Sequence, residues 1–290
     1  MESLPESMQK PRNHAPLLFT LATSLVRHKV RGGSRLLQLI QSAGLLDRPV
    51  RYPLGGGLHI DVPISRLDNC WDRETIDSYE TEAIECFTTE ARRLSAPIAY
   101  IDCGADIGIF ALKVAALLKL AQVFVIEPDP GAFPWLQSNV RQVNGKAVNC
   151  AAGSFAGRGR LEFPDYYPNH PHAQFLVNDP QGPIQIVRLD DLESNPGSLA
   201  IKIDVEGGEL EVLRGAEKKI RSSTGVVILF EAHAQVIRRT GIHPVECMRF
   251  LEGIRPFHFF VTETGEQLST ASKFELPLQI CNIIASTVTK

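Results

Sequence analysis

The sequence predicts an α/β protein with a mostly parallel seven-stranded sheet, a terminal antiparallel hairpin and an N-terminal helical appendage. Three observations lead to this prediction. Apolar runs suited to buried strands alternate with helix-length segments between residues 98 and 231. Glycine turns follow two of these runs, at Gly104 and at Gly207. Two further apolar runs flank Gly265 near the C-terminus. Such alternation implies a parallel sheet with helices on both faces, and the last two runs add antiparallel strands.

The expected appendage spans residues 1–74, and the main domain spans residues 75–290. Residues 16–46 have the apolar content of one or two helices, and residues 50–63 suggest a strand pair. The triple glycine at 55–57 lies at the turn of that pair. No Lys-Ser/Thr follows these glycines, so they indicate a turn and not a phosphate loop.

The main domain begins with an expected helix over residues 76–94, whose apolar side chains recur on one face. Asp129 and Pro130 suit the N-cap and first position of a later helix. The polar segment 164–183 lacks periodicity and is expected to be a loop. In chain order, the other expected elements are strand 98–102, helix 108–120, strand 121–127, helix 130–143, strand 147–152, a hairpin within 153–163, strand 199–205, helix 208–220, strand 226–231, helix 234–252, and terminal strands 257–262 and 276–285.

The composition is that of an ordinary globular protein, with 44% hydrophobic and 22% charged residues. The net charge of −3 gives no global basic field that would draw the chain to nucleic acid. The six cysteines are scattered without a C-x-x-C pair, so we expect no zinc site and no disulfide framework. These features predict a reducing, cytoplasmic location.

The N-terminal segment differs from the rest in charge. Residues 1–50 hold seven Lys/Arg and three Asp/Glu, which makes this segment +4 and the remainder −7. The apolar stretch from Ala15 to Val26 is too short to span a bilayer. A helix that packs on the core is the favoured interpretation. The alternative is an interfacial helix that makes weak contact with an anionic membrane surface.

A strand, a glycine turn and a helix carry the most informative motif, Asp102-Cys-Gly-Ala-Asp-Ile-Gly108. The glycines allow a tight turn and a close approach of the backbone to a ligand. Glu127 ends the next apolar run, 19 residues after Gly108, where a carboxylate can accept hydrogen bonds from both ribose hydroxyls. The unit therefore predicts a site for an adenosine-containing ligand.

The glycine spacing distinguishes between two such ligands. A nicotinamide cofactor favours G-x-G-x-x-G, whereas this motif has G-x-x-x-G with Asp102 two residues ahead. A cofactor without phosphates, carrying a sulfonium and an amino-acid tail, does not need the third glycine. We therefore expect S-adenosylmethionine in preference to NAD.

Acidic side chains at two later strand ends are the candidate catalytic groups. Asp204 and Glu206 follow one apolar run, and Glu231 and His233 end the next. Ligands of open α/β sheets sit beyond the carboxyl ends of the strands, so these groups should face the reacting methyl group. The predicted general bases are Asp204, Glu206 and His233. The alternative for each carboxylate is that it caps a helix, and the alternative for His233 is a structural role.

A metal held by Asp204, Glu206 and Glu231 is the alternative to a base, because hard cations prefer carboxylates. Direct base catalysis is preferred, and no metal site is assigned. Aromatic and histidine residues in the 164–183 loop are expected on the acceptor side: Tyr166, Tyr167, His170 and His172.

Taken together, the motifs resemble the FkbM family of methyltransferases over about residues 75–285. The matching runs are 102–108, Glu127-Pro128-Asp129, 136–139, 189–192, 202–207 with Glu209, and Phe230-Glu231. The resemblance implies a Rossmann-like class I methyltransferase fold and S-adenosylmethionine as methyl donor. The expected cofactor-binding residues are Asp102, Gly104, Ala105, Gly108, Glu127, Pro128 and Ala151. Asp106 and Cys103 depart from the family pattern, which expects Asn and a small aliphatic residue.

The resemblance implies methylation of a hydroxyl on a sugar, glycolipid or natural-product acceptor. Two other classes stay open at this stage. One is a nicotinamide-dependent oxidoreductase, which the glycine spacing disfavours. The other is a non-catalytic module that keeps the fold and is recruited through its basic N-terminal segment.

Overall fold

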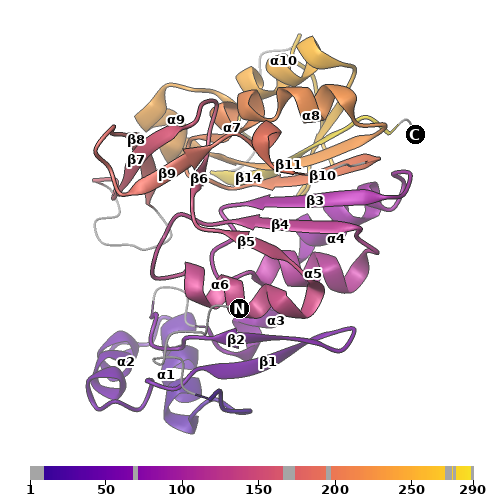
Figure 1. Cartoon of the computed structure of the whole chain (residues 1–290). Helices are drawn as coiled ribbons and strands as arrows, with labels where there is room; N and C mark the ends of the chain where they lie inside the picture. Colours follow the sequence, from indigo (N-terminus) through magenta and orange to yellow (C-terminus); the bar gives the residue numbers. More distant parts are fainter. Residues whose placement is uncertain are drawn as a thin grey trace.

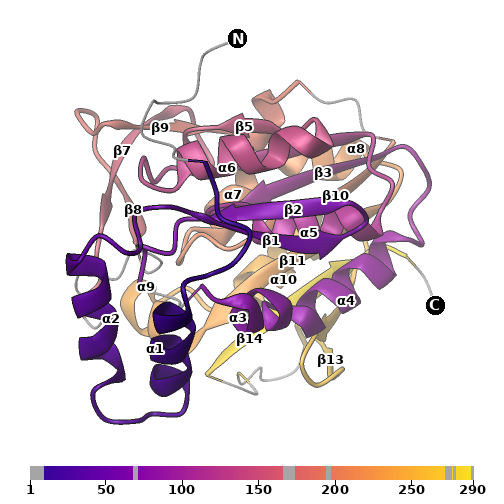
Figure 2. The ribbon, with the colours of Figure 1, turned by 90° about the horizontal axis from the view of Figure 1, so that it is seen from below.

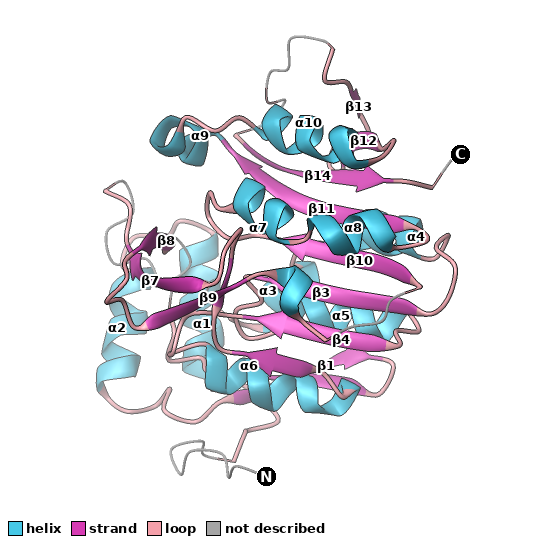
Figure 3. Ribbon diagram, turned by 45° about the horizontal axis from the view of Figure 1, so that its top comes forward, coloured by secondary structure: helices cyan, strands magenta, loops and turns pink. Residues whose placement is uncertain are grey.

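A central mixed sheet runs through the molecule in the computed structural model, which describes residues 10–67, 71–165, 174–193, 197–271, 276 and 279–288. Its strand order is β13-β12-β14-β11-β10-β3-β4-β5. Figure 1 labels the strands from β14 to β5, and Figure 3 labels β12 and β13. Neighbours from β11 to β5 pair in parallel, whereas β14, β12 and β13 join through antiparallel pairs. The bounds are β3 Ile98–Cys103, β4 Gln122–Ile126, β5 Lys146–Val148, β10 Ser198–Ile203, β11 Val226–His233, β12 His258–Val261, β13 Gln267–Leu268 and β14 Ile280–Ser286.

The predicted mostly parallel sheet with an antiparallel end is confirmed, but the strand number differs. The described residues hold eight strands in this sheet, because a two-residue strand, β13, pairs with the edge of β12. Gly265 therefore turns the chain into β13, and β14 follows later and pairs with both β11 and β12.

Helices cover both faces of the sheet (Figure 3). Alternate residues of β3 show the two layers: Tyr100 packs with Phe87 and Phe110 on one face, and Ile101 packs with Leu213 on the other. The first layer holds α4 Thr81–Ala91, α5 Ile109–Leu117 and α6 Phe133–Asn139, which continues into the 3-10 turn η1 Val140–Val143; the second holds α7 Glu209–Gly215, α8 Glu217–Ser222 and α10 Pro244–Ile254.

The N-terminal appendage packs against the first helical layer (Figure 2). Phe19 and Ile60 share a buried cluster with Ile107 and Leu112, so the predicted packing on the core is confirmed. The predicted boundary at residue 74 falls inside α3. The appendage comprises α1 Leu17–Arg27, α2 Gly33–Ser42, the antiparallel pair β1 Val50–Gly55 and β2 Leu58–Val62, and the start of α3 Arg73–Ser78.

Four expected helices break or begin later than the sequence predicted. The helix over 76–94 is divided into α3 and α4 by Glu80, which has a φ of 45°. The helix expected at 130 starts at Phe133, because the Asp129 carboxylate accepts the Gly131 amide in a turn and does not cap the helix. The helix over 208–220 breaks at Ala216, and that over 234–252 divides at Gly241 into α9 Ala234–Thr240 and α10.

The segment between β5 and β10 was also predicted incorrectly. The expected strand 147–152 is divided between β5 and β6, and the expected hairpin within 153–163 is one strand, β7. Together with β8 and β9 these form a separate four-stranded sheet of order β6-β9-β7-β8. Its partners are distant in sequence, so no local pattern reveals the pairing. The bounds are β6 Ala151–Ala152, β7 Gly157–Glu162, β8 Phe175–Asn178 and β9 Ile184–Val187, before the 3-10 turn η3 Leu189–Asp191.

The order of the strands indicates where in the sheet a ligand should bind. The chain runs from β3 outward to β4 and β5, then returns to β10 on the other side of β3. Strand order reverses between β3 and β10, and ligands of such sheets bind beyond the carboxyl ends of the strands at this point. No helix within the described residues is both long and apolar enough to cross a membrane.

Candidate functional site

A cavity of about 490 Å³ opens at the carboxyl ends of β3, β4, β10 and β11, which we call the switch-point cavity. Gly104, Glu127, Asp204 and Glu231 bring one side chain or turn from each of these strand ends to its wall. Residues of the small sheet, such as Phe175, close the opposite side. The volume lies within the range of small-molecule and cofactor sites.

Gly104 is required where the β3 turn passes the end of β10. Its φ is 76°, and a Cβ atom at this position would lie 1.8 Å from the Asp204 carbonyl oxygen. Gly108 has a φ of 93° at the N-cap of α5, where a side chain would meet Leu136 at 3.0 Å. Both glycines therefore allow close packing in left-handed backbone conformations, Gly104 against the end of β10 and Gly108 against α6, which the tight turn of the motif requires.

Glu127 holds the loops on both sides of the cavity floor. Its two carboxylate oxygens accept the backbone amides of Asp106 and Asp129, each at 2.8 Å. Burial raises the pKa of Glu127 to about 7, and the nearby Asp106 carboxylate adds to the effect. Because the carboxylate lines the cavity, its remaining lone pairs can accept the hydroxyl donors of a ribose.

A buried lysine connects the two motif strands. Lys202 Nζ donates to Asp204 Oδ2 at 2.9 Å and to the Gly104 carbonyl at 3.0 Å, and lies 3.8 Å from Asp102 Oδ1. Burial alone would lower the pKa of Lys202, but Asp204, Asp102 and Glu80 outweigh it and raise the pKa. Asp102 itself is fully buried, so it influences the site only through its contact with Lys202.

Glu80 is a site residue that the sequence analysis missed. It lines the cavity from the break between α3 and α4, and its left-handed conformation has no glycine or proline signal in the sequence. Burial raises the pKa of Glu80 to about 7, against the opposing charge of Lys202. A carboxyl that titrates near neutral pH is suited to proton transfer.

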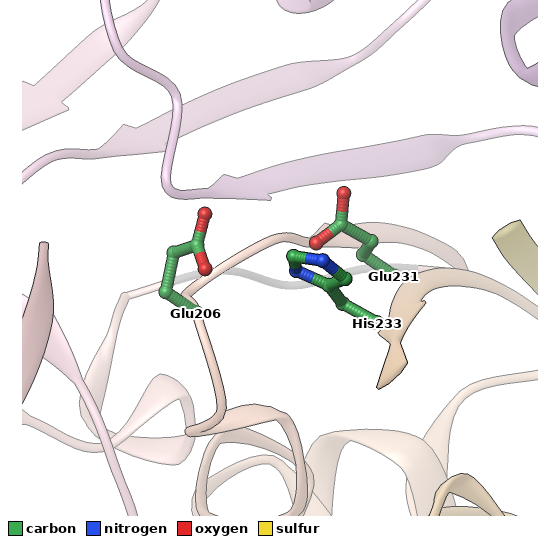
Figure 4. A group of neighbouring side chains, drawn as sticks. All are labelled: Glu206, Glu231 and His233. Carbon is green, nitrogen blue, oxygen red and sulfur yellow. The ribbon is translucent and has the colours of Figure 1, made fainter. Parts of the chain in front are cut away.

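Glu206, Glu231 and His233 form a group at the β10 and β11 ends, which we call the Glu-Glu-His cluster. One ligand atom from each lies within 4.8 Å of the others. Figure 4 shows the imidazole between the two carboxylates. Burial, together with the charges of Asp204 and Glu206, raises the pKa of Glu231 well above its usual range. Burial, and then the charge of Arg239, lowers the pKa of His233.

The predicted residues fall into two groups around the cavity. Those that line it are Gly104, Glu127, Pro128, Ala151, Asp204 and Glu206. Asp102, Ala105 and Gly108 shape the turn behind the wall, and His233 joins the cluster beside Glu206 and Glu231. Tyr166, Tyr167, His170 and His172 lie outside the described residues.

Residues that no sequence motif marks also reach the cavity from distant elements. Arg239 of α9 stacks on Phe175 of β8, with 3.8 Å between the guanidinium carbon and the ring centroid. Both line the cavity, and so does Asn178. No motif links these positions, because the small sheet brings them together only in three dimensions.

The cavity wall is strongly acidic. Among the described residues, one guanidinium, that of Arg239, faces eight carboxylates: Glu80, Asp106, Glu127, Asp129, Asp204, Glu206, Glu211 and Glu231. Lys202 and Arg66 offset the charges of Asp204 and Asp106, and burial raises the pKa values of Glu80, Glu127 and Glu231. The carboxylates that stay charged still favour a cationic ligand over a pyrophosphate. The tight glycine turn, the Glu127 acceptor and the acidic wall therefore fit S-adenosylmethionine, which carries a sulfonium and an ammonium group.

Comparison with known proteins agrees with this fit. The model of the methyltransferase FkbM domain matches residues 102–254. "Hexuronic acid methyltransferase AglP" of Haloferax volcanii is 28% identical over 138 residues, covering 47% of this chain and 56% of that protein. "Methyltransferase 1" of Beauveria bassiana is 26% identical over 143 residues, covering 40% and 57%. The chain thus matches little more than half the length of these relatives.

A solved structure is also similar to this chain. Methyltransferase FkbM from Methylobacillus flagellatus KT is 19% identical, with a TM-score of 0.44, over 69% of this chain and 47% of that one. The family model covers more than half of the 290 residues and includes the cofactor motif, Glu127 and the Glu-Glu-His cluster. The chain belongs to the FkbM family of methyltransferases, whose methyl donor is S-adenosylmethionine.

Proposed function

We propose that this FkbM-type methyltransferase transfers a methyl group from S-adenosylmethionine to a hydroxyl oxygen of a sugar, glycolipid or natural product. The observation that carries the proposal is the continuity of the switch-point cavity. It runs from Glu127, where the ribose is expected, past Gly104 to the acidic end at Asp204 and Glu231. One cavity thus offers a cofactor end and an acceptor end.

The residues of the cofactor end are those predicted from the motif. Gly104 and Ala105, with Gly108, form the turn beneath the cofactor, and Asp102 fixes Lys202 behind it. Glu127 accepts the ribose hydroxyls, while Pro128 and Ala151 provide apolar wall beside the adenine. When bound, S-adenosylmethionine supplies a methyl group that its positive sulfur has already activated.

The protein's task at the acceptor end is to orient the hydroxyl and accept its proton. Asp204 is the proposed base, since its carboxylate lines the cavity and Lys202 holds it in place. Glu206 and His233 are the other proposed catalytic residues. The name of the Haloferax relative, a hexuronic acid methyltransferase, supports a sugar acceptor.

The first test is calorimetric titration with S-adenosylhomocysteine and, separately, with NADH. We expect micromolar binding of S-adenosylhomocysteine and none of NADH, because the acidic wall repels a pyrophosphate. Binding of NADH alone would support an oxidoreductase. Binding of neither would favour a non-catalytic module that has kept only the fold.

Asp204→Asn tests the base. The substitution keeps the shape of the side chain and removes its charge, so S-adenosylhomocysteine affinity should change little. Turnover with a hydroxyl acceptor should fall about a hundredfold or more, the usual contribution of general base catalysis. The measurement is transfer of labelled methyl groups at saturating cofactor, and wild-type turnover in the variant would remove Asp204 from this role.

A further inference from the structure

We propose that Glu206, Glu231 and His233 bind one divalent transition-metal cation at the acceptor end of the switch-point cavity. The three side chains come from two neighbouring elements. Glu206 follows β10, whereas Glu231 and His233 lie two residues apart on β11 and point to the same side of that strand. The residue between them, Ala232, is buried in the core on the other side.

The three side chains are close enough to reach a single ion. Metal–ligand bonds to histidine nitrogen and carboxylate oxygen are about 2.0–2.2 Å. The cluster atoms lie within 4.8 Å of one another. In a tetrahedral or octahedral site, bonds of this length place neighbouring ligands about 3.0–3.5 Å apart, so side-chain shifts of about an ångström would close the site around a cation.

Glu231 provides a second, independent observation. Most other carboxylates at the cavity have a donor: Asp204 accepts from Lys202, Glu127 accepts two amides, and Asp106 pairs with Arg66. No residue in the described ranges donates a hydrogen bond to the Glu231 side chain or pairs with it. This partly buried carboxyl can balance its charge only with a proton or a cation, and a cation held also by Glu206 and His233 would take the place of the proton.

The donor set indicates which cations fit. Two carboxylates and one imidazole suit Mn²⁺ or Zn²⁺ better than Ca²⁺, which prefers oxygen ligands alone. Three protein ligands leave coordination positions open for the acceptor. This points to an acceptor whose hydroxyl has a second oxygen beside it, either a neighbouring hydroxyl or a carboxylate.

The proposed ion has a chemical role that rests on the proposed function. A cation bound to the acceptor hydroxyl lowers its pKa. The proton leaves to the Asp204 carboxylate, the oxygen forms the new bond to the methyl carbon, and the carbon–sulfur bond breaks with its electron pair retained by sulfur. Asp204 lines the same cavity as Glu206 and Glu231.

The experiment is calorimetric titration of the chelator-treated full chain with Mn²⁺, Zn²⁺ and Mg²⁺, each with and without saturating S-adenosylhomocysteine. We expect one site for Mn²⁺ or Zn²⁺ and weaker binding of Mg²⁺. Glu231→Gln and His233→Asn should each weaken that site about tenfold or more. Glu266→Gln and His258→Asn are matched controls at exposed positions and should bind as the wild type does.

The wild-type titration decides the matter even if a variant misfolds. Absence of a Mn²⁺ or Zn²⁺ site in the wild type, or an equally strong site in both folded cluster variants, would overturn the proposal. Binding of S-adenosylhomocysteine without a metal site would leave the methyltransferase proposal intact. A cluster-dependent metal site without methyl transfer to any hydroxyl acceptor would support the site and remove the proposed function.

Discussion

At the scale of single residues, Glu127 combines structural and binding roles. It fixes the loops at Asp106 and Asp129 and still faces the cavity. Its pKa is raised to about 7 because burial disfavours the charged form. Near neutral pH, a small change in pH therefore changes the charge of the proposed ribose acceptor.

Affinity for S-adenosylhomocysteine should consequently increase as pH rises through 7. The ionised Glu127 carboxylate accepts hydroxyl donors, and its population grows about tenfold between pH 6 and pH 8 for a pKa of about 7. Calorimetry over this range should show a several-fold decrease in Kd. Glu127→Gln should flatten the profile and Glu266→Gln should preserve it; the same slope in Glu127→Gln would assign the titration to another group, such as Glu80.

At the scale of elements, α1 has two distinct faces. Phe19 and Ala22 are fully buried against the appendage core. Leu17 is 88% exposed and Leu21 53% exposed. Exposed lysine and arginine residues follow the helix, at Lys29, Arg31 and Arg35. An exposed apolar face beside basic residues is the pattern of a helix that lies on an anionic membrane surface.

We therefore propose that α1 makes weak contact with anionic membranes, and Leu17→Ser with Leu21→Ser tests it. The full chain should co-sediment with phosphatidylserine vesicles at low salt, and the double variant should do so several-fold less. Neither side chain supports the core, so the thermal midpoint should be unchanged. Equal partitioning of both proteins would show that residues 16–46 only pack on the core.

At the scale of the whole molecule, the appendage and the main domain share one buried cluster. Ile60 of β2 and Ile107 of the cofactor motif are both fully buried in it. Arg66 also forms an ion pair with Asp106, with 2.7 Å between Nη1 and Oδ1. The architecture changes at the predicted domain boundary, but the hydrophobic packing continues across it.

Ile60→Ala should accordingly destabilise the entire chain by about 3 kcal/mol, the usual effect of removing a buried isoleucine side chain. Urea unfolding should show one transition, with loss of S-adenosylhomocysteine binding at the same midpoint. Ile280→Ala is the matched control, because Ile280 is 49% exposed, and should change stability by about 0.5 kcal/mol or less. Two separate transitions would instead identify residues 1–74 as an independent unit.

The motif strands could be predicted because their signals are local. The apolar runs that become β3, β4, β10 and β11 end in glycine or acidic residues, so both the strands and their functional ends are visible in sequence. Helix breaks were harder to predict. Glu80 adopts a left-handed conformation without the usual sequence signal, and its side chain faces the charges of Lys202 and Asp204.

The sequence by itself determined the parallel sheet, the family and the residues of the cofactor turn. Each depends on periodicity or on spacing within a few turns of chain, which neighbouring residues encode. Only the tertiary structure decided the small sheet, the donors that stabilise each carboxylate and the gathering of Glu206, Glu231 and His233. These depend on strand order and side-chain packing between distant segments, which no local pattern specifies.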